Sequence, residues 1–570
     1  MDFRPIPGVG PPPAGEDARV HLSSEAEPPP AFGPGEADPA EALLLGELAN
    51  GDLEESRSLI ESHGVDYNFP VRPNIFRPRV LSALGLLVFS AVLPSGATAA
   101  SRKSHRPAPA SEPHSLAQAL ERAALRPPAV SRGLSIEIAD LKNGDPVFER
   151  NPDSPETIAS VTKMFSTAAA LHFLGPDYKF KTTFWRQGDV RDGVLVGSLL
   201  VVGGGDPNIS GRFYNDDFNA VFDQWTEGLR KAGIQRVAGD IFLNASFFDA
   251  VSRHPEWPVG QQARWYQAPI SALSYNDNVI LVSVHPGVRP GKPAAVSIEP
   301  QNAVVRTVSR ARTVGQGRPR LAVGRADGSD SVTVSGTVPS RGSWWSTPVA
   351  IDNAPGFFGS ALRTRLLNGG IPVLGRLVEK ETRPDNSWVL VAETESDLLP
   401  TLAVTNKRSQ GFYAEQIFKT LAAEKRGIGS WPDALALEKE FLSALGLDAA
   451  RYDLHDGSGL SPNNRVAAAD VVRFLRALDS QAYGAQWKST LAVSGDPEGT
   501  LRRRLREPEL RGRILAKTGS IQGVSTLAGY VTASSGRTYA FAILLNGPRV
   551  WDSSGHAYQD RILRALVRYG

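Results

Sequence analysis

The first segment with enough apolar residues to build a core begins at residue 115. Its apolar and polar residues follow first the period of a helix and then that of a strand. Residues 115–125 carry apolar side chains at helical spacing, whereas residues 133–140 alternate with the two-residue period of a strand. Asn143-Gly144 is a strong hairpin turn, and it stands directly before a second short strand pattern at residues 146–149. The pattern therefore predicts a helix followed by a β-hairpin.

The C-terminal end has a denser strand pattern. Residues 513–520, 524–532 and 538–545 each have the composition and alternation of a strand, and a turn at residues 534–536 separates the last two. A helical pattern at residues 556–569 closes the chain. This order predicts an antiparallel sheet with a terminal helix packed on it.

Residues 157–171 end in a helical pattern, and Ser160 and Lys163 lie at its beginning. At helical spacing these two side chains project from one face. A serine hydroxyl is a poor nucleophile unless an adjacent base takes its proton, and a lysine with a lowered pKa can be that base. The motif is short, so the alternative is a pair of solvated helix positions without chemistry.

A second cation that would keep the Lys163 amine neutral stands near the other end of the chain. Lys517-Thr518-Gly519-Ser520 falls on the predicted strand 513–520. There Lys517 can bind a substrate carboxylate and lower the pKa of Lys163, Thr518 adds a hydroxyl, and Gly519 lets a substrate backbone approach. Taken alone, this stretch is also compatible with an ordinary strand end.

The N-terminal region differs from the rest. Residues 1–70 contain proline runs and an acidic bias, which predicts disorder because too little apolar surface can be buried. Residues 71–100 combine arginines, the apolar stretch 81–93 and the small residues Ala97-Thr98-Ala99, which is the order of a signal peptide. We therefore expect export to the periplasm or cell envelope, with residues 101–114 as a linker.

The position of this signal leaves alternatives open. A signal placed after residues 1–70 favours a true translation start near Val71 or Val80, so that the extension is absent from the mature protein. The apolar stretch 81–93 is shorter than the roughly 20 residues that a membrane-spanning helix needs. An uncleaved anchor with a cytoplasmic tail is the alternative, and any other membrane contact is expected to be peripheral.

Composition removes several classes of function. The chain has 570 residues, 41% of them hydrophobic, which allows several domains with sizeable cores. Its net charge of +2 gives no indication of nucleic-acid binding. It contains no cysteine, and its nine histidines show no ligand spacing, so neither a metal site nor a cofactor is expected.

The order of the two lysine motifs resembles the penicillin-interacting serine enzymes, in which Ser-x-x-Lys, Ser-x-Asn and Lys-Thr-Gly line one cleft. From residue 115 to 570 the chain is similar to one branch of them, the class C low-molecular-mass penicillin-binding proteins, or penicillin-binding protein 4 type D-alanyl-D-alanine carboxypeptidase/endopeptidases. Three stretches carry this resemblance: Gly203-Gly204-Gly205-Asp206-Pro207, residues 266–278, and Asp456-Gly457-Ser458-Gly459-Leu460-Ser461.

This resemblance implies an α+β fold, with a β-lactamase/transpeptidase-like domain of an antiparallel sheet flanked by helices. That domain is expected at residues 115–190 and 391–570, because the second motif follows Lys163 at a far greater distance than in a compact β-lactamase. Residues 191–390 are the expected insertion. Strand patterns inside it, at 235–243, 295–298 and 331–334, predict strand-rich inserted domains.

The second motif departs from the family pattern. Ser409-Gln410-Gly411 aligns with Ser-x-Asn, but Gly411 stands where asparagine is expected. Ser409 keeps a hydroxyl that can relay a proton to a leaving amine. The asparagine amide is missing, and Gln410 can replace it only if its side chain turns inward.

The resemblance implies an exported serine DD-peptidase that acts on peptidoglycan stem peptides and is acylated by β-lactam antibiotics. Ser160, Lys163 and Ser409 are its expected catalytic residues, and Lys517 to Ser520 its expected substrate-binding residues, with backbone N–H groups of Ser160 and Ser520 as oxyanion donors. Two alternatives are a non-catalytic or weakly active peptidoglycan-binding relative, because of Gly411, and a β-lactamase, which the long insertion disfavours.

Overall fold

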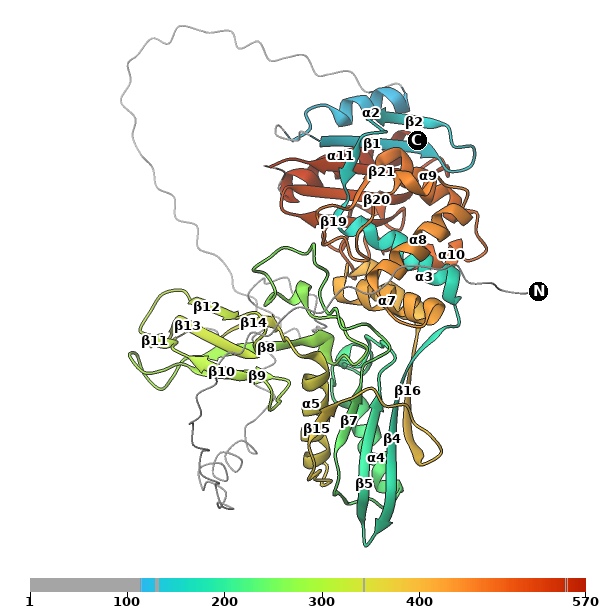
Figure 1. Cartoon of the computed structure of the whole chain (residues 1–570). Helices are drawn as coiled ribbons and strands as arrows, with labels where there is room; N and C mark the ends of the chain where they lie inside the picture. Colours follow the sequence, from blue (N-terminus) through green and yellow to red (C-terminus); the bar gives the residue numbers. More distant parts are fainter. Residues whose placement is uncertain (1–112, 114, 129–132, 342–343, 549, 551) are drawn as a thin grey trace, which may run out of the picture. The chain divides into compact units, whose positions relative to one another are not determined.

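The computed structural model describes residues 113, 115–128, 133–341, 344–548, 550 and 552–570 (Figure 1). The predicted extension at residues 1–70 and the predicted signal peptide at 71–100 lie outside these residues, as does the linker at 101–114 except for residue 113. Among the helices of the described part, none combines the length and the hydrophobicity that crossing a bilayer requires.

The main sheet is antiparallel throughout, with the strand order β18-β19-β20-β21-β1-β2. Its strands are β1 (Gly133–Asp140), β2 (Pro146–Arg150), β18 (Ala492–Val493), β19 (Ile514–Ile521), β20 (Val524–Thr532) and β21 (Thr538–Asn546). The first strand, β1, pairs along its whole length with the last, β21. The predicted hairpin and the predicted C-terminal strands are therefore parts of one sheet.

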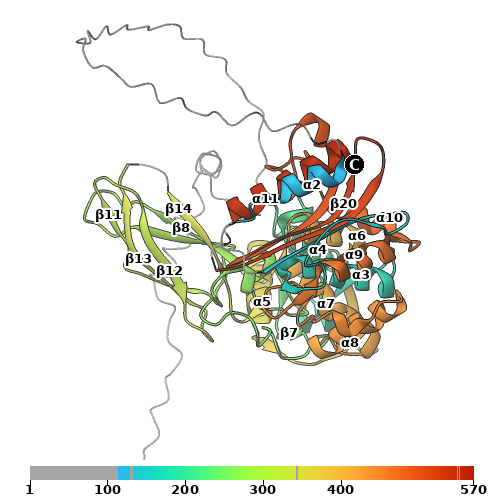
Figure 2. The same cartoon turned by 90° about the horizontal axis from the view of Figure 1, so that it is seen from above.

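Helices cover both faces of the main sheet. On one face α2 (Leu116–Ala124) and α11 (Asp552–Tyr569) lie side by side (Figures 1 and 2). Phe541 of β21 packs in the core under these helices, whereas its neighbour Ala542 packs in the core on the opposite face. Because both faces are covered, β20 and β21 are almost continuously buried instead of alternating.

The opposite face carries a helical layer. It contains α3 (Lys163–Leu174), α6 (Leu398–Lys407), α7 (Gly411–Arg426), α8 (Trp431–Ala444), α9 (Ala468–Asp479) and α10 (Gly484–Ser489). Helix α3 contacts α6, α7, α8 and α10, and every residue from Lys163 to Leu171 is buried. The helix that follows Ser160 is therefore held by packing on several sides.

A second sheet of the order β15-β7-β5-β4-β16 is built from the middle of the chain, with β6 paired to β5. Its strands are β4 (Lys179–Arg191), β5 (Val194–Val202), β6 (Arg236–Val237), β7 (Ile241–Asn244), β15 (Leu377–Glu379) and β16 (Trp388–Asp397). The strand predicted at 235–243 is divided into β6 and β7 by a bend at Gly239, although the Gly239 N–H still donates to the Gly197 carbonyl of β5 at 2.8 Å.

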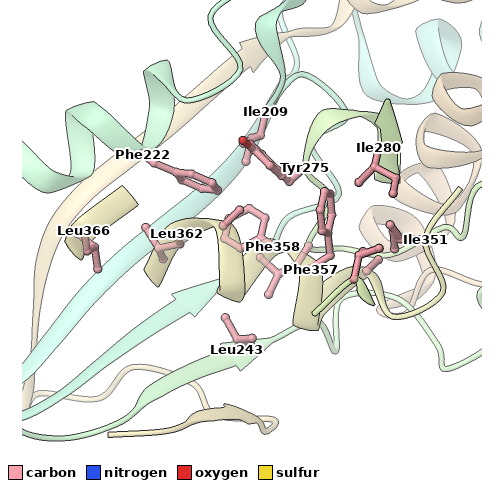
Figure 3. Packing of buried hydrophobic residues seen from close by; sticks show 14 of the residues in the cluster. Ile209, Phe222, Leu243, Tyr275, Ile280, Ile351, Phe357, Phe358, Leu362 and Leu366 are labelled. Carbon is pink, nitrogen blue, oxygen red and sulfur yellow. The ribbon is translucent and has the colours of Figure 1, made fainter. Parts of the chain in front are cut away.

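Two helices, α4 (Ala220–Lys231) and α5 (Ala354–Asn368), contact this second sheet and enclose an aromatic core (Figure 3). Phe222 stacks on Tyr275 with ring centroids 4.9 Å apart, and its edge meets Phe358 at 5.1 Å. Burial of such large rings is the main contribution to the stability of this part of the chain.

Two small sheets complete the strand-rich insertion. One has the order β14-β8-β9, with β8 (Val279–His285), β9 (Ala295–Glu299) and β14 (Trp345–Ala350). In the other, β13 (Ser331–Pro339) pairs with β10 (Arg306–Ser309), β11 (Arg312–Val314) and β12 (Arg320–Arg325). A two-stranded ladder joins β3 (Pro155–Thr157) to β17 (Arg465–Ala467). The predicted α+β class with strand-rich additions is confirmed.

Candidate active site

The sequence pattern predicts Ser160 in the first turn of an α-helix. In the structure it lies in a tight turn that precedes the helix. Residues Ala159–Thr162 form a 3₁₀ turn, and α3 begins only at Lys163. Ala159 has φ of 46°, which is unusual for a residue with a side chain. Thr162 Oγ1 donates to the Ala159 carbonyl at 2.8 Å and helps to hold this conformation. The strained turn fixes the direction of the Ser160 side chain.

Lys163 contacts Ser160 directly. Its Nζ lies 2.9 Å from Ser160 Oγ and 2.5 Å from the carbonyl oxygen of Ser458. The side chain is almost completely buried, and burial lowers the pKa of Lys163 to about 8, although the nearby carboxylates of Asp456 and Glu415 oppose this shift. A useful fraction of neutral amine is therefore present near neutral pH.

Lys517 and Ser409 form a second contact pair. Lys517 Nζ donates to Ser409 Oγ and to the Thr518 carbonyl, both at 2.7 Å. Burial, and then the charge of Lys163, lower the pKa of Lys517 well below its usual value. Burial is the main cause that lowers the pKa of Lys163. Repulsion between two cations acts on both of them, so the predicted influence of Lys517 on the pKa of Lys163 stays a prediction.

The second motif connects α6 to α7. Ser409 has φ of 58°, and Gln410 donates from Nε2 to Asp277 Oδ2 at 3.1 Å. Asp277 is itself paired with Arg212 at 2.5 Å, so the Gln410 side chain is occupied in this buried cluster and does not replace the missing amide. At Gly411 an added Cβ would lie 3.7 Å from Ser458 Cβ, which is ordinary contact. There is room for the first atom of a side chain at Gly411, and its φ is not positive.

Two buried carboxylates hold the loop that carries the Ser458 carbonyl. Glu415 on α7 accepts the N–H groups of Gly457 (3.1 Å) and Ser458 (2.8 Å). Asp456 accepts three more N–H groups of the same loop, from Gly459, Leu460 and Ser461. The Ser458 carbonyl is thereby aimed at Lys163 Nζ, which makes both carboxylates positioning groups for the lysine.

Sequence reasoning did not assign these two roles. Asp456 belongs to a stretch that resembles the family, but that resemblance assigns it no function. Glu415 stands four positions after Gly411, one turn along the helix. This spacing is the signal in the sequence that places Glu415 on the same face of the helix as Gly411. Burial raises the pKa of Glu415 to about 7, so its charge is costly and is offset by the loop N–H groups and by Trp431 Nε1 at 2.8 Å.

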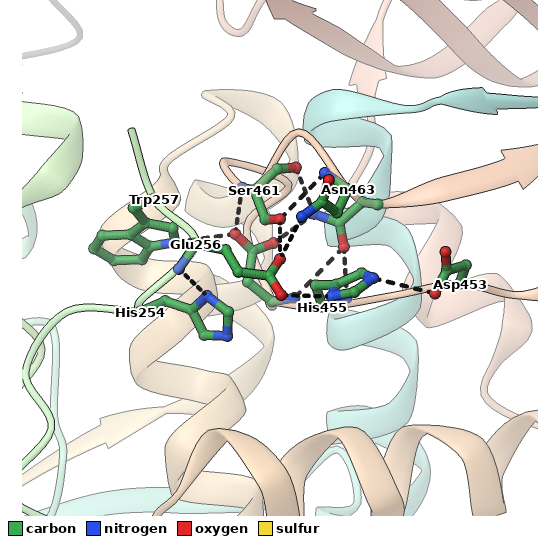
Figure 4. Close-up of polar contacts among 9 residues, drawn as sticks. His254, Glu256, Trp257, Asp453, His455, Ser461 and Asn463 are labelled. Carbon is green, nitrogen blue, oxygen red and sulfur yellow. Dashed lines mark hydrogen bonds and ion pairs between the residues drawn. The ribbon is translucent and has the colours of Figure 1, made fainter. Parts of the chain in front are cut away.

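The inserted segment supports the outer side of this loop (Figure 4). Glu256 accepts hydrogen bonds from Ser461 Oγ at 2.6 Å and Asn463 Nδ2 at 3.1 Å, and it lies 2.9 Å from His455 Nδ1. The neighbouring Trp257 donates from Nε1 to Asp456 at 3.0 Å. Through these contacts the insertion stabilises the loop whose Ser458 carbonyl contacts Lys163.

Strand β19 offers an edge beside Ser160. Its neighbour β18 pairs only with Leu515 and Ala516, so among the described strands none continues the ladder along residues 517–520 on that side. Gly519 fits there because a Cβ would lie 2.6 Å from the carbonyl oxygen of Ile158. An extended peptide can therefore pair with this edge while its carbonyl group reaches Ser160.

Together these contacts suit acyl transfer by a serine and a lysine. Within the described residues no group of side chains could hold a metal ion. Residues 116–568 match the model of the D-Ala-D-Ala carboxypeptidase 3 (S13) family. The chain belongs to this family. The predicted relationship to the penicillin-binding protein 4 type is confirmed, and the protein is a serine-type D-Ala-D-Ala carboxypeptidase.

Relatives of this S13 carboxypeptidase span most of its length. The D-alanyl-D-alanine carboxypeptidase of Actinomadura sp. (strain R39) is 30% identical over 467 residues, 78% of this chain and 84% of that protein. The D-alanyl-D-alanine carboxypeptidase DacB of Haemophilus influenzae is 25% identical over 397 residues, 68% of this chain and 80% of that protein.

Among solved structures, penicillin-binding protein 4 (dacB) from Haemophilus influenzae shares the fold of this S13 carboxypeptidase. It aligns with a TM-score of 0.69 at 22% identity, over 79% of this chain and 99% of that chain. The same protein complexed with a β-lactam aligns with a TM-score of 0.66.

Proposed function

We propose that the chain cleaves D-Ala-D-Ala or cross-bridge peptide bonds of peptidoglycan stem peptides through an acyl-enzyme on Ser160. The observation that supports this proposal most directly is the 2.9 Å contact between Lys163 Nζ and Ser160 Oγ at a buried position. β-Lactams would acylate the same hydroxyl, in keeping with the β-lactam complex of the Haemophilus influenzae relative.

In the acylation step, Ser160 Oγ attacks the carbonyl carbon while its proton passes to the neutral amine of Lys163. The carbonyl oxygen becomes an oxyanion, and the proposed donors to it are the N–H groups of Ser160 and Ser520. One such donor contributes about 3 to 4 kcal/mol in comparable sites. The C–N bond then breaks, and the proton moves from Lys163 through the Ser409 hydroxyl to the leaving amine. Water then attacks the carbonyl carbon of the ester in the same way, and hydrolysis of the ester frees Ser160.

The terminal carboxylate of the substrate is proposed to bind Lys517, with Thr518 and Ser520 beside it. A bound carboxylate favours the charged form of a buried lysine, so it restores the charge that burial and Lys163 disfavour at Lys517. Substrate binding and protonation of Lys517 are therefore coupled. Lys163 Nζ also contacts the Ser458 carbonyl. This contact keeps Lys163 aligned with Ser160 when Lys517 becomes protonated.

Gly411 provides the test between a catalytic protein and a peptidoglycan-binding relative without activity. We expect wild-type protein to be acylated slowly by a fluorescent penicillin, with the adduct on Ser160. Gly411→Asn should accelerate acylation about ten- to a hundredfold, because one hydrogen bond to a charged or polarised group is worth about 1.5 to 3 kcal/mol. The rate is measured by gel fluorescence over time, and the adduct is mapped by mass spectrometry.

Gly411→Ala is the matched control, because it adds the Cβ that the site accommodates without adding an amide. It should acylate no faster than wild type. Fast acylation of the wild type, with no gain in Gly411→Asn, would make the glycine a harmless variation. If neither wild type nor Gly411→Asn forms an adduct on Ser160, the non-catalytic alternative replaces the proposal.

We propose further that the protein is exported to the periplasm or cell envelope, which is where its substrate lies. The motif Ala97-Thr98-Ala99 places the expected cleavage so that the mature chain begins near Ala100 or Ser101. N-terminal sequencing of the protein from the envelope fraction measures this directly. A mature chain that begins near Met1 would contradict both the cleavage and the proposed later translation start.

A further inference from the structure

One end of the sheet formed by β10, β11, β12 and β13 carries a dense positive charge. We call residues 286–293, 312–320 and 340–341 the basic tip. Its six basic side chains are all exposed: Arg289, Lys292, Arg312, Arg318, Arg320 and Arg341. No aspartate or glutamate occurs in residues 286–298 or 300–326. This concentration contrasts with the nearly balanced charge of the whole chain.

The strand register brings the tip arginines together. Arg312 of β11 and Arg320 of β12 both pair with Thr337, from the two sides of β13. Residues that pair across neighbouring strands point to the same face of a sheet. The two guanidinium groups therefore flank a small hydroxyl side chain on one exposed face, and Arg318 stands in the connection between β11 and β12.

Loops from two other parts of the insertion, at residues 286–293 and 340–341, contact the same end of this sheet. The N–H groups of Gly287 and Gly291 donate to the side chain and the carbonyl of Thr313, each at 2.8 Å, which places Arg289 and Lys292 beside β11. Similarly, Ser340 N donates to the Val314 carbonyl at 2.7 Å.

Little of the charge of the tip is used to hold the fold together, apart from a long hydrogen bond of 3.5 Å from Arg312 to the Gly291 carbonyl. Buried Arg325 of the same sheet is paired with Asp352 at 3.1 Å. None of the six tip bases has a carboxylate within ion-pair distance among the residues that the structure describes. Their mutual repulsion costs folding free energy, so this surface is better explained by an anionic partner than by stability.

The shape of the tip fits a flat partner better than a linear polymer. Val288 is 95% exposed between the bases, and a Cβ added at Gly291 or Gly317 would meet nothing within 4 Å. Two cavities of about 510 and 290 Å³ are found elsewhere in the described chain, and neither includes a tip residue. Bases around a projecting apolar side chain are typical of surfaces that rest on lipid headgroups.

We propose that the basic tip docks the protein onto an anionic phospholipid bilayer as a peripheral contact. The proposal is independent of the chemistry at Ser160, and it gives a partner to a surface that the hydrolytic reaction does not use. Near an anionic membrane each lysine or arginine contributes about a fivefold increase in binding. Several bases acting together would hold the enzyme at the membrane, and the enzyme could still dissociate and bind again.

The test is cosedimentation of the full chain with vesicles. The triple variant Arg312→Gln/Arg318→Gln/Arg320→Gln should bind vesicles that contain phosphatidylglycerol about a hundredfold more weakly than wild type, following the fivefold effect per base. Wild type should bind vesicles of pure phosphatidylcholine poorly, and raised salt should release it from the anionic vesicles. The thermal unfolding curve of the triple variant should match that of wild type, which shows that the fold is intact.

The matched control is Lys142→Gln/Lys231→Gln/Lys439→Gln, which removes the same charge from three exposed positions outside the tip. It should bind anionic vesicles within a few-fold of wild type. Equal binding by wild type and the tip variant would overturn the proposal, and so would equal loss in both variants. Binding of a soluble glycerol-phosphate polymer without binding of vesicles would assign the tip to a polymer, and the membrane proposal would fail.

Discussion

Ser160→Ala is expected to abolish covalent labelling by penicillin and the release of D-alanine from a peptide that ends in D-Ala-D-Ala. The substitution removes the hydroxyl that Lys163 Nζ contacts at 2.9 Å, so no acyl-enzyme can form. The fold should be unaffected, since Ala159 and Thr162 keep the contacts that define the turn. Labelling by fluorescent penicillin and D-alanine release are the two measurements.

Ser534→Ala serves as the control for this experiment, because Ser534 is exposed in the turn between β20 and β21. It should label at the wild-type rate. A thermal unfolding curve of Ser160→Ala that matches wild type would exclude misfolding as the cause of lost labelling. Labelling that persists in Ser160→Ala would show that another serine is the nucleophile.

Lys163→Met is expected to lower the acylation rate by about a hundred- to ten-thousandfold, the usual range for loss of a general base. Methionine fills most of the buried volume but cannot accept a proton. The pH dependence gives a second readout. Because the neutral amine is the active form and its pKa is lowered to about 8, wild-type acylation should rise about tenfold per pH unit up to pH 8 and then level off.

The rise with pH should be absent from Lys163→Met. Lys231→Met, at an exposed position on α4, should keep both the rate and the pH profile of wild type. If Lys163→Met acylated fast with an unchanged profile, the base would have to be another group, and Lys517, also buried and close to Ser409, would be the first to test.

The sequence patterns predicted the main sheet well because its strands alternate or are densely apolar. The predicted strands at 133–140, 524–532 and 538–545 differ from β1, β20 and β21 by at most one residue. Helix α11 begins at Asp552, several residues before the predicted 556, since Gly555 weakens the helical pattern there. The predicted domain boundaries and the roles of the site residues stay predictions.

Long-range contacts limited the prediction of the site. Ser160 and Lys163 are three positions apart whether they lie in one α-helix or in a 3₁₀ turn that leads into a helix. The spacing of the two residues therefore does not show where α3 begins. The direction of Gln410 depends on Asp277, far away along the chain. The same reason hid the role of Glu415, because its partners come from the loop at residues 456–461.

The pairing of β1 with β21 also has a consequence for the order of folding. A chain that emerges from its N-terminus exposes β1 long before its partner β21 exists, so the main sheet must remain incomplete until nearly all of the protein has been made. Strands β4 and β16, which pair with each other, are both available within that interval. The insertion can therefore gather its own core first, whereas the turn that carries Ser160 can meet β19 only after the C-terminal part of the chain is present.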